Sequence, residues 1–220
     1  MVLDYKNNKE FALANGIKLE NDIGETQFKG NDVCKGITFR NFFNLCVEST
    51  VFEDCIFENC GNINAEGCRF NGCNFNNVNN IKGIRTAFDG CEFKNCCSNG
   101  AFLVIETLGF IDSCTFDTIT TLGENGYIIY SVYRKGTEVE RVKNCKFIDC
   151  QVETEDGKYC YCAYLKRSYS LIPVEIDNVD YETCDFGEGD AIEIGGLDLD
   201  VLEGDYDGIE IIGSFVSEDD

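Results

Sequence analysis

Three nine-residue stretches decide the expected fold, namely Phe52-Glu-Asp-Cys-Ile-Phe-Glu-Asn-Cys60, Phe70-Asn-Gly-Cys-Asn-Phe-Asn-Asn-Val78 and Phe88-Asp-Gly-Cys-Glu-Phe-Lys-Asn-Cys96. Apolar residues stand at positions one, four, six and nine of each stretch, and position six is aromatic. The same pattern begins again at residues 34, 111, 142 and 176, so successive starts lie 18, 18, 18, 23, 31 and 34 residues apart. Such a period is typical of a solenoid in which each repeat stacks on the next.

The spacing inside each copy predicts short strands joined by corners. Positions four and six place two side chains on one face of a strand. The gaps of three on either side predict corners, where Gly, Asn and Asp tolerate a left-handed backbone. The corner residues are Gly36, Asp54, Gly72, Gly90, Ser113, Asn144 and Asn178 on one side, and Asn41, Asn59, Asn77, Asn95, Thr118, Asp149 and Thr183 on the other. Eighteen residues in three short sides predict one turn of a parallel β-helix.

In that fold equivalent positions stack at about 4.8 Å from coil to coil. The expected aromatic ladder is Phe39, Phe57, Phe75, Phe93, Phe116, Phe147 and Tyr181, and the expected thiol ladder is Cys55, Cys73, Cys91, Cys114 and Cys145. Cysteine acts here as a small hydrophobe that fits a narrow interior. A reactive role would require exposed, electropositive surroundings. The corner asparagines predict a third, polar ladder.

The composition of the 220 residues permits a core, since 44% are hydrophobic and 26% charged. The fifteen cysteines are an odd number, contain no Cys-x-x-Cys pair and are accompanied by no histidine, which argues against a zinc or iron–sulfur site. We expect no cofactor, although a Ca²⁺ site stays open because corner aspartates serve turns equally well. No apolar run approaches the length of a membrane span, and the first residues do not have the pattern of a signal peptide. Buried thiols favour a reducing cytoplasm, unless a signal was removed and the protein is on the cell surface or secreted.

The two ends differ from the repeats, within one expected domain spanning residues 1–220. Residues 7–16 predict a short amphipathic helix that Asn7 or Asn8 caps and Gly16 ends, covering the first coil. Residues 17–186 form the coils, beginning with a strand at 17–20. Residues 187–220 are acidic and carry no Lys or Arg, yet segments 191–194, 197–201 and 208–212 alternate as final strands and a cap.

The segment Lys9-Glu-Phe-Ala-Leu-Ala-Asn-Gly16, followed by Ile17-Lys-Leu-Glu-Asn-Asp-Ile23, resembles the entry of right-handed parallel β-helices of the pectate-lyase-like and adhesin-like kinds. Asn144-Cys-Lys-Phe-Ile-Asp-Cys150 is similar to their coil repeats. The resemblance implies an all-β, right-handed, single-stranded parallel β-helix with a short N-terminal capping helix. It implies no activity, because that fold carries lyases, hydrolases, adhesins and spacers. The Cys-x-Phe pairs also resemble pentapeptide-repeat proteins. Those proteins keep a five-residue period around all four sides of each coil, whereas here the period is interrupted after three sides.

The longer coils hold the candidate ligand-binding residues. Extra residues at 97–110, 120–141 and 151–175 each contain a strand-like stretch after a glycine, so these stretches are expected to stack as one sheet. Tyrosine faces stack on sugar rings, and Arg and Lys pair with uronate carboxylates. The candidates are Tyr130, Tyr133, Arg134, Lys135, Tyr164, Lys166, Arg167 and Glu106. In β-helix lyases, a Lys or Arg removes the proton α to a carboxyl group, so the resemblance implies this role for Lys166 or Arg167. No lyase motif is matched, and solvated charges at the ends of an ordinary sheet explain the same residues.

Three functions are therefore compared. The first is a non-catalytic, adhesin-like binding or scaffold protein that meets a carbohydrate or protein on its wider C-terminal coils. The second is a polysaccharide lyase or hydrolase acting on acidic glycans there. The third is an acidic DNA mimic that binds a topoisomerase, as some pentapeptide-repeat proteins do. The net charge of −22 argues against binding nucleic acid itself. A mimic requires unbroken acidic lines, whereas cations interleave with the acids at Lys35, Arg40, Arg69, Lys82, Arg85 and Lys94.

Overall fold

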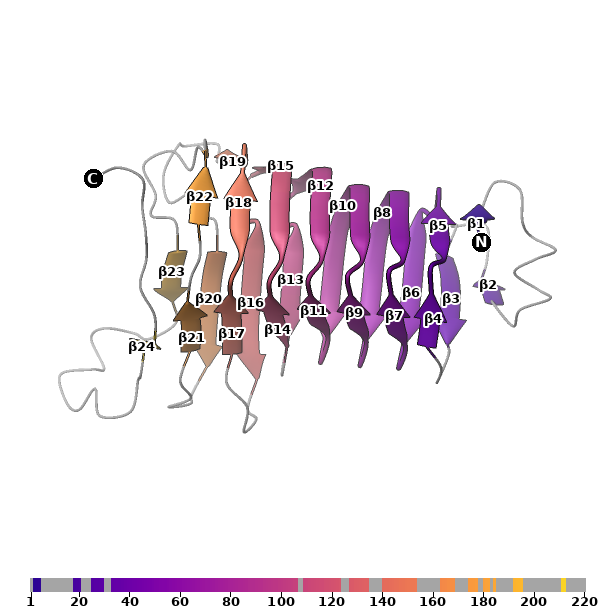
Figure 1. Cartoon of the computed structure of the whole chain (residues 1–220), viewed down its shortest axis with the longest axis horizontal. Helices are drawn as coiled ribbons and strands as arrows, with labels where there is room; N and C mark the ends of the chain where they lie inside the picture. The colour runs from indigo at the N-terminus through magenta and orange to yellow at the C-terminus, as the bar shows by residue number, and fades with distance from the viewer. Residues whose placement is uncertain are drawn as a thin grey trace.

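The computed structural model describes residues 2–4, 18–20, 25–29, 33–106, 109–123, 127–134, 140–153, 163–168, 174–177, 180–182, 184, 192–195 and 211–212. These residues form strands wound into a parallel β-helix (Figure 1). The coils rise along the near side of the view, descend along the far side and advance from the N-terminus towards the C-terminus, so the helix is right-handed. The predicted all-β, right-handed class is confirmed. The expected helix at 7–16 lies outside the described residues. Among the described residues, no helix has the length and apolar character that crossing a membrane requires.

Each complete coil has three sides. The first side is an eight-stranded sheet of β4 (Val33–Lys35), β7 (Val51–Glu53), β9 (Arg69–Asn71), β11 (Ala87–Asp89), β14 (Phe110–Asp112), β17 (Glu140–Lys143), β21 (Val174–Asp177) and β24 (Ile211–Ile212). The second side consists of β1 (Val2–Asp4), β5 (Thr38–Arg40), β8 (Ile56–Glu66), β10 (Asn74–Ile84), β12 (Glu92–Asn99), β15 (Thr115–Leu122), β18 (Lys146–Ile148) and β22 (Asp180–Glu182).

The third side continues from the second without a break in β8 and β10, whose eleven residues bend around the corner. It runs through β3 (Glu25–Lys29), β6 (Asn44–Glu48), the later halves of β8 and β10, and then β13 (Leu103–Glu106), β16 (Ile129–Arg134), β20 (Ala163–Ser168) and β23 (Ile192–Gly195). An added ladder joins Cys97–Asn99 of β12 to the end of β15 and to β19 (Gln151–Glu153).

The predicted corners are confirmed wherever the structure describes them. Asn41, Asp54, Asn59, Asn77, Asn95, Ser113, Thr118, Asn144 and Asp149 have positive φ, as do Gly36, Gly72 and Gly90. A third corner, which the repeat pattern did not include, is formed by Ser49, Gly67 and Arg85, again with positive φ. The polar ladder is confirmed where the Asn77 amide donates to Asn59 at 2.9 Å.

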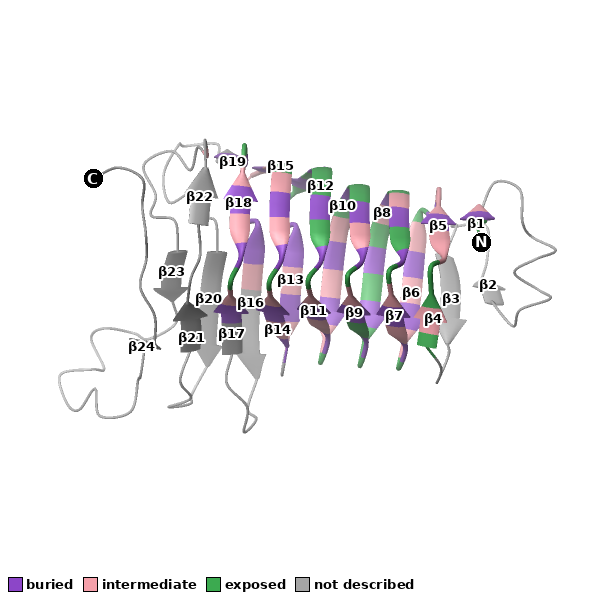
Figure 2. Ribbon diagram, viewed as in Figure 1, coloured by how far each residue is buried: buried purple, intermediate pink, exposed green. Residues whose placement is uncertain are grey.

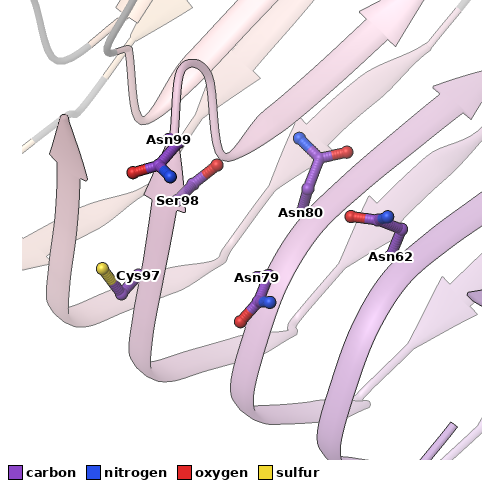
Figure 3. A pocket seen from close by; sticks show the side chains of 6 residues that line it. All are labelled: Asn62, Asn79, Asn80, Cys97, Ser98 and Asn99. Carbon is purple, nitrogen blue, oxygen red and sulfur yellow. The ribbon is translucent and has the colours of Figure 1, made fainter. Parts of the chain in front are cut away.

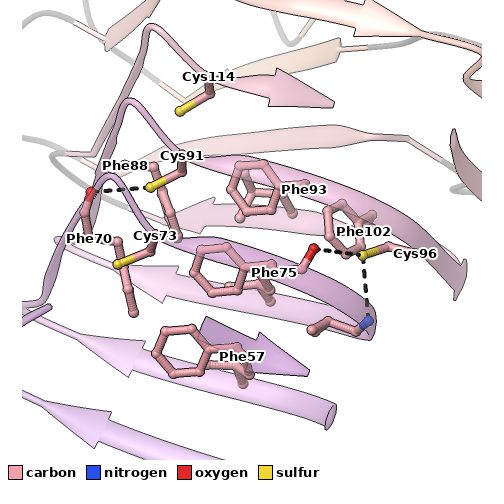
Figure 4. Packing of buried hydrophobic residues seen from close by; sticks show 14 of the residues in the cluster. Phe57, Phe70, Cys73, Phe75, Phe88, Cys91, Phe93, Cys96, Phe102 and Cys114 are labelled. Carbon is pink, nitrogen blue, oxygen red and sulfur yellow. Dashed lines mark hydrogen bonds between the residues drawn. The ribbon is translucent and has the colours of Figure 1, made fainter. Parts of the chain in front are cut away.

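The interior contains the two predicted ladders (Figure 4), and buried positions alternate with more exposed ones along the strands (Figure 2). Phe39, Phe57, Phe75, Phe93, Phe116 and Phe147 are buried, with neighbouring rings stacked at 4.7 to 4.9 Å. The register places Tyr181 next in this row, beside Phe147. A second ring ladder, Phe52, Phe70 and Phe88, stacks at 4.9 Å and meets the first edge-on. The five predicted thiols, Cys55, Cys73, Cys91, Cys114 and Cys145, are all buried and not disulfide-bonded.

The buried thiols also satisfy main-chain carbonyl groups at the corners. Cys55 donates to the carbonyl of Cys34 at 3.3 Å, and Cys91 donates to that of Phe70 at 3.3 Å, each one coil earlier. Burial raises the pKa of Cys60 and Cys96 to about 11. A weak donor with an apolar body suits a site that is dry yet faces a carbonyl oxygen, which explains cysteine at these corners.

The strands at the two ends were predicted in part. β2 (Lys18–Glu20) coincides with the expected strand at 17–20 and pairs antiparallel with β3. β23 and β24 coincide with two of the alternating acidic segments, while 197–201 lies outside the described residues. β1 was not predicted. It pairs with β5 and buries Leu3 next to Phe39.

Candidate functional site

The third side of the wider coils brings the predicted stretches together. β13, β16, β20 and β23 pair in parallel, so the expected single sheet of inserted strands is confirmed. The sheet continues the third side of the narrower coils, since β13 also pairs with β10. Coils of 23 residues and more therefore keep the same wall as coils of 18 residues.

Within this wall, which we call the broad face (β13, β16, β20 and β23), the candidates fall into separate rows. Tyr130 is the register partner of Tyr164, and Tyr133 is that of Arg167. Glu106 and Lys166 flank Val132 in a third row. Arg134 pairs with Ser168, and Lys135 lies outside the described residues. The chain thus aligns all the described candidates on three adjacent strands, β13, β16 and β20, but not as one cluster.

Tyr130 has an aromatic neighbour that the candidate set missed. The rings of Tyr127 and Tyr130 are stacked, with centroids 5.5 Å apart and planes 13° apart. Tyr130 is half-buried, as is Tyr127. The sequence contained a signal for this pair, since the two tyrosines stand three residues apart directly after Gly126. The pair forms a rigid, amphipathic surface of the kind that binding sites favour.

Glu106, the one carboxylate among the candidates, is engaged with a cation from the preceding coil. Its Oε1 lies 2.8 Å from the Nζ of Lys82, and its side chain is only 15% exposed. This ion pair holds Lys82 of β10 against β13, the neighbouring strand in the next coil. Glu106 is therefore a structural partner in the wall of the coil.

The other interleaved cations are paired in the same manner. Lys35 contacts Glu53 at 3.2 Å, and Arg69 contacts Asp89 at 3.3 Å, both on the next coil. Further pairs join Arg40 to Glu58, Arg85 to Glu66 and Lys94 to Asp117. Asp117 raises the pKa of Lys94 by hydrogen bonding and by its charge, and Lys94 lowers the pKa of Asp117. Pairing of opposite charges along the coils breaks up the acidic lines that a DNA mimic requires.

A hollow lies at a different place, where the 18-residue coils meet the first wider coil (Figure 3). Six residues line this hollow, which we call the step groove: Asn62, Asn79, Asn80, Cys97, Ser98 and Asn99. Its volume is about 460 Å³. Sequence reasoning missed it, because it arises from a difference in length between neighbouring coils and not from a motif. Among the described residues, no group of three or more Cys, Asp or Glu side chains is arranged to hold a metal ion.

No protein-family model matches the chain, and no curated protein matches it. Two solved structures of QnrB1, described as a plasmid-mediated fluoroquinolone resistance protein, are similar to it at 8% sequence identity and a TM-score of 0.25. They cover 80% and 84% of this chain, and 95% and 91% of their own. QnrB1 is a pentapeptide-repeat protein, one of the two classes that the sequence resembles. The fold described above rests on the strand register of this chain, and the pectate-lyase-like resemblance stays a prediction.

Proposed function

We propose that this protein is a non-catalytic binding or scaffold protein, and that its broad face is the surface that meets a carbohydrate or protein partner. The observation that carries the proposal is the pairing of Glu106 with Lys82 at 2.8 Å on a side chain only 15% exposed. A carboxylate that takes part in acid–base catalysis must come within reach of a substrate proton. Here the candidate carboxylate already accepts from a lysine of the protein.

The regularity of the broad face supports the same conclusion. Four parallel strands in register place their residues in rows at a spacing of about 4.8 Å, which suits repeated contacts with an extended partner. The stacked Tyr127 and Tyr130 rings supply a preformed aromatic surface on it. Tyr164 extends the row of Tyr130 by one strand.

The test is native affinity electrophoresis through gels that contain pectin, alginate or xylan, with and without Ca²⁺. Wild-type protein is compared with Tyr130→Ala, and with Asn64→Ala as the matched control. Asn64 stands in the same register row as Tyr130, three coils before it, on a narrow coil. Retardation that Tyr130→Ala removes and Asn64→Ala keeps supports a carbohydrate partner on the broad face.

Two other results lead elsewhere. A cleared zone along the lane shows cleavage and overturns the non-catalytic assignment in favour of a polysaccharide-degrading enzyme. Unchanged mobility in every polymer eliminates those glycans and leaves a protein as the partner. In that case crosslinking from the broad face, with Asn64 again as the control position, identifies which protein contacts it.

A further inference from the structure

The step groove contains a strand edge that the rest of the fold does not use. Residues Cys97–Asn99 of β12 pair on one side with Thr120–Leu122 of β15, which in turn pair with β19. Within the described residues, no strand pairs with their other side. That side faces β10, whose pairing with β12 ends at Lys94 and resumes only with β13, at Leu103. The five-residue lengthening of this coil therefore leaves a short, open edge next to the narrower coils.

The direction of the peptide groups follows from one hydrogen bond. The N–H of Gly100 donates to the carbonyl of Leu122 at 2.7 Å, so the peptide groups of Gly100 face β15. Main-chain groups of successive residues in a strand point to opposite sides, which places those of Ser98 towards β15 as well. The N–H and C=O groups of Cys97 and Asn99 therefore point into the groove. Unpaired groups on a strand edge are a template for another strand.

The floor of the groove is polar, uncharged and fixed. Asn62 and Asn80 are register partners on β8 and β10, and the Asn62 amide donates to Asn44 at 2.9 Å. The Asn80 amide donates to the carbonyl of Ala101 at 2.6 Å, which ties the floor to the lengthened loop. No ionised or aromatic side chain stands among the six lining residues. The chemistry of this floor matches main-chain amides and small polar side chains, because each carboxamide both donates and accepts.

The size of the groove agrees with a short strand. Adjacent strands lie about 4.8 Å apart, three residues extend about 10 Å, and a strand with its side chains is about 10 Å deep, which gives roughly 480 Å³. The groove holds about 460 Å³. Three residues are also the length of the open edge, Cys97–Asn99.

We propose that the step groove binds an extended, uncharged segment of another polypeptide, which adds as a strand to the open edge of β12 and lies over Asn62, Asn79 and Asn80. The added strand continues the ladder of β19, β15 and β12 by one member. This is β-augmentation, in which main-chain hydrogen bonds provide most of the affinity. The step groove shares no residue with the broad face, so this proposal can be tested independently of the function proposed above.

The experiment uses the exposed thiol of Cys97 to hold a probe in the groove. The probe is the acetylated, amidated peptide Thr-Thr-Cys-Thr-Thr, equilibrated with the whole protein in a glutathione redox buffer. A second probe has the same side chains, but the threonine amides flanking its cysteine are N-methylated. Occupancy of Cys97 is measured by peptide mapping and mass spectrometry, so that reaction at other cysteines does not enter.

The expected result is an equilibrium constant for the mixed disulfide at Cys97 on the order of tenfold higher for the unmodified peptide, because two main-chain hydrogen bonds form only with it. Equal constants for the two peptides overturn the proposal, since the thiol then reacts without strand pairing. Asn99→Pro removes the N–H that faces the groove, whereas the matched control Asn99→Thr keeps it. Asn99→Pro is expected to abolish the preference and Asn99→Thr to keep it, and a preference that survives in Asn99→Pro also overturns the proposal. Urea unfolding checks that each variant is folded, and the comparison of the two peptides on wild-type protein requires no variant.

Discussion

Replacing Phe75 with alanine tests whether the stacked rings hold the coils together. Phe75 is fully buried, and its ring stacks on Phe57 at 4.8 Å and on Phe93 at 4.9 Å. It also meets Phe70 edge-on at 5.4 Å. Truncating a buried Phe to Ala costs about 3 to 5 kcal/mol, and each lost aromatic pair adds about 0.5 to 1.5 kcal/mol to the burial term.

The surrounding coils decide where in that range the value falls. β10 is paired with β8 on one side and with β12 and β13 on the other, so the walls cannot close around the cavity. We therefore expect Phe75→Ala to lower the free energy of unfolding by about 5 kcal/mol, a large part of the total stability of an ordinary domain. Phe39→Ala, with one stacked neighbour in the first complete coil, is expected to cost less, about 3 kcal/mol.

The assay is urea unfolding followed by circular dichroism, with the m-value as a check on cooperativity. Phe43→Ala is the control, because that ring is 64% exposed. A loss below about 2 kcal/mol for Phe75→Ala, or a loss equal to that of the control, refutes the argument that the interior is rigidly stacked. A reduced m-value indicates instead that coils on the two sides of the cavity unfold separately, as repeats of a solenoid can.

Three further outcomes are expected. Gly61→Ala should destabilise the protein by about 2 kcal/mol or more in urea unfolding, because the added Cβ would lie 2.2 Å from the carbonyl oxygen of Phe43. Gly36→Ala should cost less, because no atom lies within 4 Å of the added Cβ and the strain comes from the positive φ alone. Asp117→Asn should lower the urea midpoint at neutral pH, because Lys94 lowers the pKa of Asp117 in the folded state. The difference from wild type should begin to shrink as the pH falls through 3.8, the ordinary carboxyl pKa of the unfolded chain, and should vanish below the lower pKa that Asp117 has in the folded state. Iodoacetamide at pH 8 should alkylate the exposed Cys97 within minutes. Cys60 and Cys96 should stay unmodified until urea is added, because burial raises the pKa of each thiol to about 11. Peptide mapping measures the labelling of each cysteine, and rapid labelling of Cys96 would contradict the dry interior.

The sequence predicted the ladders and two of the corners because both are periodic. Cys73, Phe75 and Asn77 each recur at eighteen residues with the same chemistry, so one copy explains the next. The third corner was missed because Ser49, Gly67 and Arg85 share a backbone conformation but not a residue type. β1 was missed for another reason, since its pairing with β5 joins distant residues and has no repeat to indicate it.

The candidate site was predicted less completely than the fold. The stacking of the strands that contain Tyr130 and Tyr164 followed from the inserted stretches, and the register confirms it. The binding of Glu106 to Lys82 depends on which residues face each other across two coils, which the spacing along one chain does not determine. The step groove depends on the difference in length between neighbouring coils of 18 and 23 residues. The position at which the extra residues depart from the sheet is known only from the folded structure.

The ring ladder stays in register while the coils grow longer. Phe93, Phe116 and Phe147 stack at 4.7 Å, although the coils that separate them contain 23 and 31 residues. In the 23-residue coil most of the added length lies between the second corner and β13, whereas in the 31-residue coil part of it lies before β16 and part between β16 and β17. Coil length between the strands therefore varies in this fold while the stacking of Phe93, Phe116 and Phe147 is kept. These inserted segments are where we expect the protein to accept a grafted foreign loop.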